Sequence, residues 1–419
     1  MKILIRKAHI IDPSSPFHHS KKDILITNGL VEEIAASIDQ NADQIIEAQN
    51  IYISPGWIDV FANFNDPGFE FKETLETGAR SAAAGGFTHV FVIPNTNPAI
   101  DTKSQVEYIR RKSDQLPVSI HPIGAVSRGA EGKDLAEMYD MYSSGAVAFS
   151  DGTKPIQSSG LLLKALQYVK SFDGVVIQIP DDNTIGTFGL LNEGVVSTRL
   201  GLPGKPSMSE ELMVARDIKL ARYAESKLHL TGLSSAKSLE YANRAKEGGI
   251  KVTCSVTPYH LYFVDEDLAG YDTNLKVFPP LRSKKDRSTL LDALKSGQID
   301  CISTHHQPHE WDSKICEFEY AKPGMIGLES CFGVLSALGI GADQFVNLAA
   351  VNPRKIFNLP ESTIQKGSVA DYTLFSPELK YTFSEIDIKS KSKNSPFIGK
   401  ELKGKVIGII NGEKVFLNS

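Results

Sequence analysis

The residues best equipped for chemistry lie in one short segment, "STHHQPHE", which contains His305, His306 and His309. Imidazole nitrogens bind zinc and similar metals, and two histidines three residues apart can share one ion where the segment turns helically. Asp151, in "AFSDGTKP", could ligate a metal, act as a general base, or hold its own loop by accepting backbone N–H groups. These four side chains are the candidate set for one metal ion. The alternative is that the histidines are ordinary hydrogen-bonding groups of a loop.

Other kinds of site have little support in the sequence. The glycine-bearing stretches "AAAGGFTHV" and "GLPGKPSMSEE" lack the spacing of a phosphate-binding loop and indicate a helix end and a loop leading to a helix cap. The serines at strand ends have no G-x-S-x-G context. The four cysteines show no C-x-x-C spacing and are expected to be free thiols: Cys254, Cys301, Cys316 and Cys331.

Eight short, nearly all-apolar runs follow Gly56, and helix-like segments separate them. Runs of this kind are typical of parallel strands buried on both faces. The runs are "WIDVFA", "HVFVIPN", "VSIHPIGAV", "AVAFSD", "GVVIQIP", "LHLTGL", "KVTCSVTP" and "DCISTH". Eight strand–helix units over about 300 residues predict a (β/α)8 TIM barrel.

Both ends of the chain have a different texture. Residues 1–54 contain short alternating strands with Pro, Asn and Gly turns, which predict a small antiparallel unit, and β texture returns in "GSVADYTLFSPELKYTF" and "LKGKVIGIINGEKVFL". We therefore expect a composite β-sandwich domain from residues 1–54 plus 364–419, beside a barrel domain of residues 55–363.

Catalytic groups of such a barrel sit at the carboxyl ends of its strands. The strand ends here present Phe61, Asn63, Asn95, Asp151, Ile179, Gly232, Tyr259, His260, His305 and His306. A hydrolytic zinc site needs three or more protein ligands with one open position, and a two-metal site needs more. This set is too poor in ligands for two metals.

Composition narrows the class of partner. The chain has 419 residues, a net charge of −5 and 41% hydrophobic residues, and its one short basic stretch, "KSKSKNSPFIGKELKGK", is typical of a solvated loop. Nucleic acid is therefore not an expected partner. The start "MKILIRKAHIIDP" indicates a strand and not a signal peptide, and no apolar run is long enough to span a bilayer. A cytoplasmic protein without membrane contact is expected.

Along its whole length the chain resembles the class I dihydroorotases of the amidohydrolase superfamily. The resemblance rests on blocks in the family's order, among them "PGWID", "KETLETGARSAAAGGFTHVFVIPNTNPAID", "GAVAFSDG", "GIKVTCSVTPYHL", "PPLRSKKDR", "NPRKIFNL" and "NSPFIGKELKGKV". It implies the barrel and composite β-sandwich described above. It also implies zinc chemistry that interconverts carbamoyl-aspartate and dihydroorotate in pyrimidine synthesis.

The family's catalytic pattern is mostly missing from this chain. At the family's H-x-H-x-R positions, which supply two metal ligands and a substrate Arg, stand Phe61, Asn63 and Asn65. The other two histidine ligands correspond to Ile179 and Gly232. The catalytic Asp position holds His305, and the substrate-binding Asn before "PPLR" is Phe278. The resemblance thus implies a degenerate member that has lost its histidine metal ligands.

A few positions of the family's site are retained. Asp151 stands at the metal-bridging carboxylate, His306 is a second metal-site remnant, and Asn95, His309 and Gly327 are remnants of the substrate pocket. The family's P-F-G loop has become "AKPGMIG", with Lys322 and Pro323 shifted into it.

Three hypotheses follow from this pattern. The first is a catalytically inactive dihydroorotase homologue, or pseudoenzyme, without a metal cofactor, which serves as a structural or regulatory partner of aspartate carbamoyltransferase within a homo- or hetero-oligomer. The second is an active amidohydrolase with a rebuilt mononuclear site, zinc being the expected metal, held by Asp151, His305, His306 and His309. The third is a relic pocket for an orotate-like ligand at Asn95, His309 and the loop before Gly327.

Overall fold

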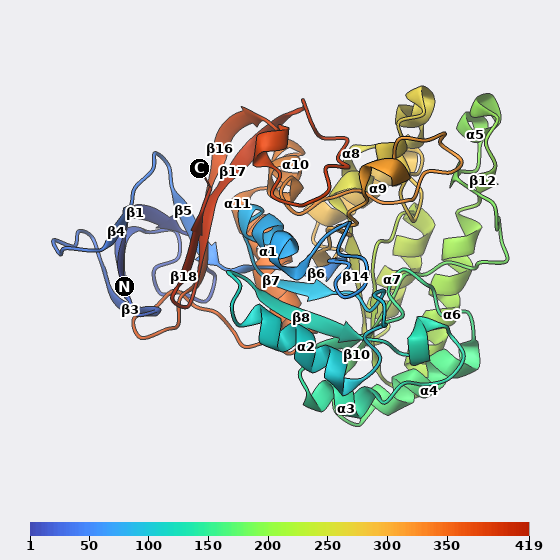
Figure 1. The fold of residues 1–419 in the computed structure, drawn as a ribbon, viewed down its shortest axis with the longest axis horizontal. Helices are drawn as coiled ribbons and strands as arrows, with labels where there is room; N and C mark the ends of the chain where they lie inside the picture. The colour runs from blue at the N-terminus through green and yellow to red at the C-terminus, as the bar shows by residue number, and fades with distance from the viewer. Residues whose placement is uncertain (419) are drawn as a thin grey trace.

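The computed structural model describes residues 1–418 and contains two eight-stranded sheets, one of them rolled into a barrel (Figure 1). Neighbouring barrel strands pair in parallel and follow one another in chain order. The strands are β6 (Trp57–Ala62), β7 (Phe87–Val92), β8 (Ser119–Gly124), β9 (Ala148–Phe149), β10 (Val175–Gln178), β13 (Lys227–Leu230), β14 (Val252–Val256) and β15 (Cys301–Ile302). Each of the eight predicted apolar runs overlaps one of them, so the predicted TIM barrel is confirmed.

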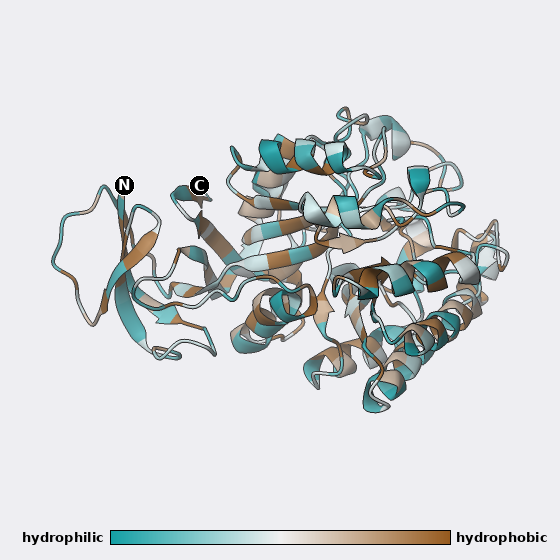
Figure 2. Cartoon of the chain, turned by 90° about the horizontal axis from the view of Figure 1, so that it is seen from below, coloured by the Kyte–Doolittle hydropathy of each residue, from teal (hydrophilic) through white to brown (hydrophobic). Residues whose placement is uncertain are grey.

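Helices cover the outside of the barrel and present their apolar faces to it (Figure 2). Several begin at a Ser or Thr whose hydroxyl accepts a backbone N–H of the first turn, as for Thr74, Ser158, Ser235 and Ser283. The main helices are α1 (Leu75–Ala84), α2 (Lys103–Ser113), α4 (Ser159–Lys170), α6 (Met208–Ala224), α7 (Ala236–Glu247) and α9 (Lys284–Lys295). Shorter ones are α3 (Met138–Ser143), α5 (Val195–Leu200), α8 (Pro258–Tyr262), α10 (Cys331–Ala337), α11 (Ala342–Val346) and α12 (Asn352–Ile356).

The barrel closes where β6 meets the segment that follows β15. The carboxylate of Asp59, which is fully buried, accepts the backbone N–H of Thr304 at 2.6 Å and its hydroxyl at 2.9 Å. The backbone N–H of Asn63 then donates to the carbonyl of His306 at 2.8 Å. The last strand is thereby held against the first at the end of the barrel that carries the candidate site.

Strands from both ends of the chain form the second sheet, in the order β18-β17-β16-β5-β1-β2-β3, with β4 also paired to β1. Their bounds are β1 (Lys2–Ile10), β2 (Lys21–Thr27), β3 (Leu30–Ala35), β4 (Gln44–Ile46), β5 (Tyr52–Pro55), β16 (Asp371–Thr382), β17 (Glu401–Asn411) and β18 (Lys414–Leu417). The expectation of a purely antiparallel N-terminal unit is wrong, because β4 and β5 both run parallel to β1. After the β2–β3 hairpin the chain returns to the start of β1 and then follows it in the same direction.

A buried charged cluster joins this sheet to the barrel. The guanidinium of Arg354 pairs with the carboxylate of Asp371 and donates to the carbonyl of Gly56 at 2.8 Å, while His89 Nε2 lies 3.2 Å from the same carboxylate. Although burial opposes ionisation, His89 and Arg354 hold the pKa of Asp371 well below its usual value.

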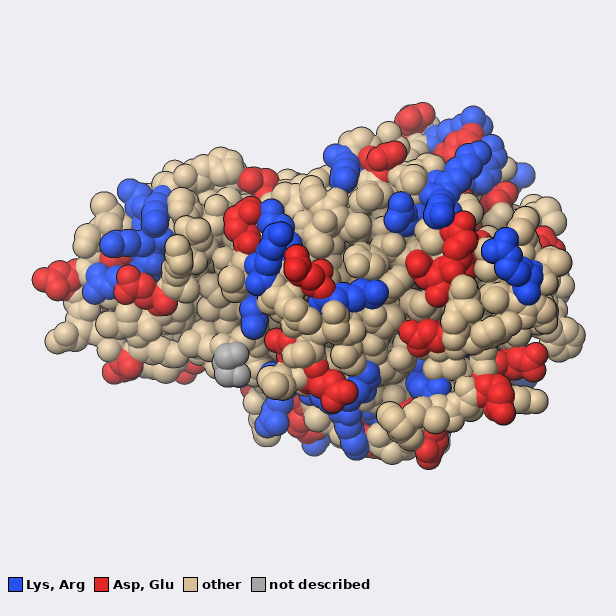
Figure 3. Space-filling view, turned by 90° about the horizontal axis from the view of Figure 1, so that it is seen from above, with Lys and Arg blue, Asp and Glu red and all other residues tan. Residues whose placement is uncertain are grey.

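On the surface, Lys and Arg side chains are interspersed with Asp and Glu across the face displayed in Figure 3. Among the helices of residues 1–418, none combines the length and apolar character needed to cross a membrane. The four cysteines are free thiols, as expected, and three of them are buried.

Candidate functional site

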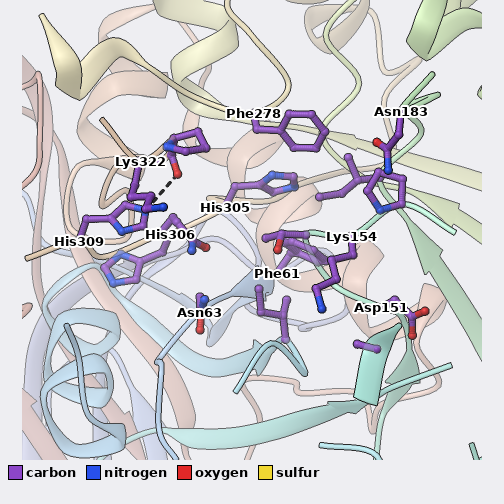
Figure 4. Close-up of a pocket in the computed structure, with 18 of the residues that line it drawn as sticks. Phe61, Asn63, Asp151, Lys154, Asn183, Phe278, His305, His306, His309 and Lys322 are labelled. Atoms are coloured by element: carbon purple, nitrogen blue, oxygen red, sulfur yellow. Dashed lines mark hydrogen bonds between the residues drawn. The ribbon is translucent and has the colours of Figure 1, made fainter. Parts of the chain in front are cut away.

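A cavity of about 540 Å³ opens at the carboxyl ends of the barrel strands. Its lining combines apolar side chains from the barrel with polar groups from the surrounding loops (Figure 4). Among the lining residues are Phe61, Asn63, Ile93, Asp151, Lys154, Ile179, Tyr259, Phe278, His305, His306, His309 and Lys322. Most of the predicted site residues are therefore brought together at one place, whereas Asn95, Gly232 and Gly327 do not line the cavity.

The rings of Phe61 and His305 form the floor of the cavity. Phe61, on β6, is 2% exposed, and its ring centroid lies 4.7 Å from that of His305. His305 Nε2 lies 2.8 Å from the hydroxyl oxygen of Thr231. Burial, with smaller contributions from two neighbouring histidines, lowers the pKa of His305 to about 3, so the ring is neutral at physiological pH.

Gly232 provides the room for this ring. Its φ of +69° lies in the left-handed region, and a β-carbon added there would stand 2.5 Å from His305 Cε1. A side chain at position 232 and the imidazole at position 305 therefore compete for the same space.

Asn63 and Asn65 shape the loop after β6. The backbone N–H of Asn65 donates to Asn63 Oδ1 at 2.9 Å, and Asn65 itself has a φ of +59°. Asparagine adopts this left-handed conformation more readily than most residues because its short amide bonds to nearby backbone. Both side chains are buried, and neither offers the imidazole or guanidinium that the resembling family has at these positions.

Both ring nitrogens of His306 lie next to protein groups. Its Nδ1 accepts the backbone N–H of Gly327 at 3.2 Å, so its Nε2 carries a hydrogen and lies 3.6 Å from the carboxylate of Glu73. Burial of Glu73 opposes ionisation, but His306 and the hydroxyls of Ser390 and Thr77 hold the pKa of that carboxyl below its usual value. The pair ties the loop after β15 to the loop before α1.

Asp151 is held by its own surroundings. One carboxylate oxygen accepts the backbone N–H of Ser127 at 2.9 Å, and the other accepts the Ser127 hydroxyl. Burial nevertheless raises the pKa of Asp151. Asn95 braces the same loop, donating to the Asp151 carbonyl at 3.0 Å and accepting the N–H of Thr153 at 2.8 Å. The expected pocket remnant Asn95 is thus a structural brace in this fold.

His309 keeps one ring nitrogen without a hydrogen-bond partner among residues 1–418. Its Nε2 lies 3.0 Å from the carbonyl oxygen of Pro323. A carbonyl can only accept, so Nε2 carries the hydrogen and Nδ1 carries the lone pair. Burial lowers the pKa of His309 to about 4, which keeps the ring neutral. Nδ1 is buried and has no hydrogen-bond partner within residues 1–418.

The candidate metal ligands do not meet around a common point. Within the part of the chain that the structure describes, the single group of three His, Cys, Asp or Glu side chains with ligand atoms inside 4.8 Å is His18, His19 and Asp343, at the surface. The structure does not bring Asp151, His305, His306 and His309 together as one set of ligands, and each of them has at least one donor atom engaged, by Ser127, Thr231, Gly327 and Pro323 respectively. With Phe61, Asn63, Ile179 and Gly232 at the family's ligand positions, the residues present do not fit a zinc ion.

Sequence reasoning missed several residues of this site. The hydroxyl of Thr231 contacts the His305 ring. Ser127, in the loop after β8, donates to Asp151. Glu73, in the loop before α1, lies beside His306. Lys154 lines the cavity only three residues after Asp151, so its place in "SDGTKP" was a readable signal. Nothing local marks Ser127 or Glu73 as site residues.

A (β/α)8 barrel with its candidate site at the strand ends, beside a sheet built from both termini, is an amidohydrolase-type fold. In agreement, the L-hydantoinase (dihydropyrimidinase) from Arthrobacter aurescens superposes with a TM-score of 0.85, covering 99% of this chain and 96% of that one, at 22% identity. A crystal structure of a D-hydantoinase gives 0.84 over 100% and 95% of the two chains, at 19% identity. At these identities the likeness concerns the fold.

Sequence comparison gives the family. A family model described as "Dihydro-orotase-like" matches residues 51–238. Dihydroorotase of Syntrophus aciditrophicus (strain SB) is 38% identical over 424 residues, covering 99% of each chain. Dihydroorotase of Caldanaerobacter subterraneus subsp. tengcongensis is 40% identical over 412 residues, covering 97% of this chain and 95% of the relative. The chain belongs to the dihydroorotase family.

Proposed function

We propose that this chain is a non-catalytic dihydroorotase-family protein of pyrimidine biosynthesis, which serves as a structural or regulatory partner of aspartate carbamoyltransferase. The observation that carries the proposal is the floor of the barrel mouth. There the rings of Phe61 and His305 lie in contact over Gly232, where the resembling family places metal ligands and the catalytic Asp.

Loss of the hydrolytic reaction follows from the chemistry of these groups. The family's reaction uses a metal-bound hydroxide, and removing even one ligand or its supporting group weakens metal binding by about 10–100-fold or more. Here Phe61 and Ile179 put buried apolar side chains at ligand positions. His305, with a pKa of about 3, is also a poor general base at neutral pH, since an efficient base titrates near the working pH.

The retained scaffold supports a binding role. The barrel is closed by Asp59 and Thr304, and the Arg354–Asp371 cluster joins it to the second sheet. These contacts hold the two sheets together, and they do not involve the groups that catalysis would need. The outer surface could therefore bind a partner even if the protein has no activity. Degenerate members of the family accompany aspartate carbamoyltransferase, and this is the reason for choosing that enzyme as the partner.

Metal content and activity test the first half of the proposal. The purified protein, expressed with added zinc or manganese, is analysed for metal and assayed for interconversion of dihydroorotate and carbamoyl-aspartate. We expect much less than one metal ion per chain and no turnover above that of buffer. One chelator-removable ion per chain together with turnover would contradict the proposal and support an active amidohydrolase with a rebuilt site.

Complex formation tests the second half. Aspartate carbamoyltransferase from the same organism is mixed with this protein and followed by sedimentation and by its own activity. We expect a complex of defined stoichiometry, with a change in the oligomer or kinetics of the carbamoyltransferase. The matched control is a catalytically competent dihydroorotase from another organism. Independent sedimentation of the two proteins, with unchanged carbamoyltransferase kinetics, would rule out the partnership.

A further inference from the structure

We propose that the cavity at the barrel mouth binds a flat, largely apolar organic anion that also carries one N–H or O–H donor. The site uses Lys154, Lys322 and His309 around an aromatic and aliphatic floor. Its ligand differs in chemistry from the polar cyclic amides of the resembling family. The proposal concerns binding alone and does not depend on the function proposed above.

The floor favours an apolar, flat body. Phe61, Ile179 and Phe278 line the cavity where the resembling family has metal ligands or a polar substrate contact, and Ile93 and Tyr259 extend the same surface. Ligand sites are mostly apolar with a few placed polar groups, and aromatic walls favour stacked or edge-on rings. A ligand that filled this floor with polar edges would lose its water contacts without replacement.

Two lysines supply the charge. Lys154 lies on the side of Asp151, and Lys322 lies on the side of His309 (Figure 4). Neither lysine makes an ion pair with any residue in 1–418, whereas pairs are present elsewhere on the surface.

The carboxylates of the lining are already engaged. Glu131 lies 3.1 Å from Lys133, and Asp151 accepts two hydrogen bonds from Ser127. The two lysine ammonium groups are therefore the available charges, and they match an anionic group such as a carboxylate.

His309 is the reason for expecting an N–H or O–H donor on the ligand. The side chain is 6% exposed and lines the cavity, and its Nδ1 has no hydrogen-bond partner among the described residues 1–418. An unfilled buried acceptor is costly, and an N–H or O–H of a ligand would satisfy it. The ligand is thus expected to carry one donor directed toward His309 while its anionic group meets a lysine.

The volume of the cavity and the hydrogen bonds already made by Asn95 and Gly327 narrow the class of ligand further. About 540 Å³ lies within the usual range of sites for small organic molecules, roughly 300–1,000 Å³. Two of the three groups expected to hold an orotate-like ring are engaged, since Asn95 braces the Asp151 loop and the N–H of Gly327 donates to His306, and only His309 keeps an open acceptor.

Three matched probes test the inference by calorimetry on the full chain. The first, 6-hydroxy-2-naphthoate, has a flat apolar body, a carboxylate and one O–H donor. Its methyl ester lacks the charge, and the corresponding methoxynaphthoate lacks the donor. We expect saturable binding of the hydroxynaphthoate at one site, and binding about tenfold or more weaker for each of the other two.

Variants assign the contacts. Lys154→Met and Lys322→Met should weaken the hydroxynaphthoate, and together they should abolish its preference over the ester. His309→Phe should abolish its preference over the methoxynaphthoate. Lys103→Met, at an exposed position on α2 outside the cavity, is the matched control and should bind like the unmodified protein. Circular dichroism confirms that each variant is folded.

Three results would overturn the inference: no saturable binding of the hydroxynaphthoate at 1 mM, equal affinity for the acid and its ester, or binding that survives the double lysine substitution unchanged. Orotate serves as a further competitor. Tighter binding of orotate than of the hydroxynaphthoate would replace the proposed ligand class with that of the family's own substrates.

Discussion

The imidazole of His305 fills the space in which a side chain on Gly232 would stand, with Cε1 only 2.5 Å from the position of a β-carbon at residue 232. In the resembling family these two positions hold a catalytic Asp and a metal-ligand His. Here a large ring just after the eighth barrel strand accompanies the smallest residue just after the sixth. The two exchanges are coupled by volume, so reversal of either alone should be unfavourable.

Gly232→Ala should measure this coupling. The left-handed φ of +69° costs about 1 kcal/mol for any β-carbon, and the clash with His305 should add about 1–3 kcal/mol to the loss of unfolding free energy. Gly249→Ala is the matched control, since its φ is +74° but no atom lies within 4 Å of an added β-carbon. Urea unfolding of both variants isolates the clash. A double variant with His305→Ala should recover that part, and equal losses at positions 232 and 249 would show that no coupling exists.

Restoring two ligands should not restore the site. The double variant Phe61→His, Asn63→His places imidazoles on β6 and in the loop after it. Ile179 and Gly232 still stand at the two other metal-ligand positions, and His305 still stands at the position of the catalytic Asp. We expect less than one zinc per chain by elemental analysis and no dihydroorotate turnover. Stoichiometric zinc in this double variant would mean that the other positions contribute ligands that the structure does not indicate.

Acid should destabilise the protein through its buried neutral histidines. The pKa of His305 is lowered by burial from 6.5 to about 3, so the unfolded chain takes up a proton that the folded chain refuses. The resulting stabilisation is complete above pH 6.5 and is lost progressively as the pH falls toward 3. From pH 7.5 to pH 5, His305 alone should account for about 2 kcal/mol.

Substitution tests this assignment. His305→Asn should flatten the pH dependence of the unfolding free energy by about that amount over the same range, measured by urea unfolding. His19→Asn, at a histidine with a 60% exposed side chain, is the control for exchanging a histidine for asparagine at a position of positive φ. Both positions have a positive φ that asparagine tolerates. An unchanged slope in His305→Asn would show that this ring titrates normally in the fold.

The Asp59–Thr304 contact should contribute strongly to barrel stability. Asp59→Ala leaves the buried N–H and hydroxyl of Thr304 without acceptors and should cost about 2–4 kcal/mol. Asp59→Asn should cost less than about 1 kcal/mol, since an amide can accept the N–H and donate to the hydroxyl. Thr304→Val removes only the hydroxyl bond and should cost about 1 kcal/mol. Chemical unfolding of the three variants at pH 7.5 checks this order, and equal losses in the Ala and Asn variants would contradict it.

The same carboxyl makes a pH-dependent contribution of opposite sign to that of His305. Burial raises the pKa of Asp59 to about 6, so its stabilising effect is present below pH 3.8 and is lost as the pH rises through 6. Asp59→Asn should therefore gain stability relative to the unmodified protein between pH 5 and pH 8. A constant difference across that range would show that Asp59 is ionised throughout.

The barrel architecture and the missing metal ligands could both be predicted from the amino-acid sequence. Eight apolar runs predicted eight barrel strands because strands buried on both faces cannot carry polar alternation, and β6 is buried at every position. The family blocks placed Phe61, Asn63, Ile179, Gly232 and His305 at positions whose chemistry is local to each residue type. No folding can make a ligand of phenylalanine or glycine.

The roles of the surviving polar groups could not be predicted, because they depend on contacts between distant parts of the chain. Asp151 and His306 were candidates for a metal because carboxylates and imidazoles can bind one, but their partners Ser127, Gly327 and Glu73 come from other loops of the barrel mouth. Hydrogen bonds between residues far apart in sequence depend on where closure of the barrel brings each loop. The parallel pairing of β4 and β5 with β1 was likewise hidden, because alternation indicates a strand but not its neighbour or direction.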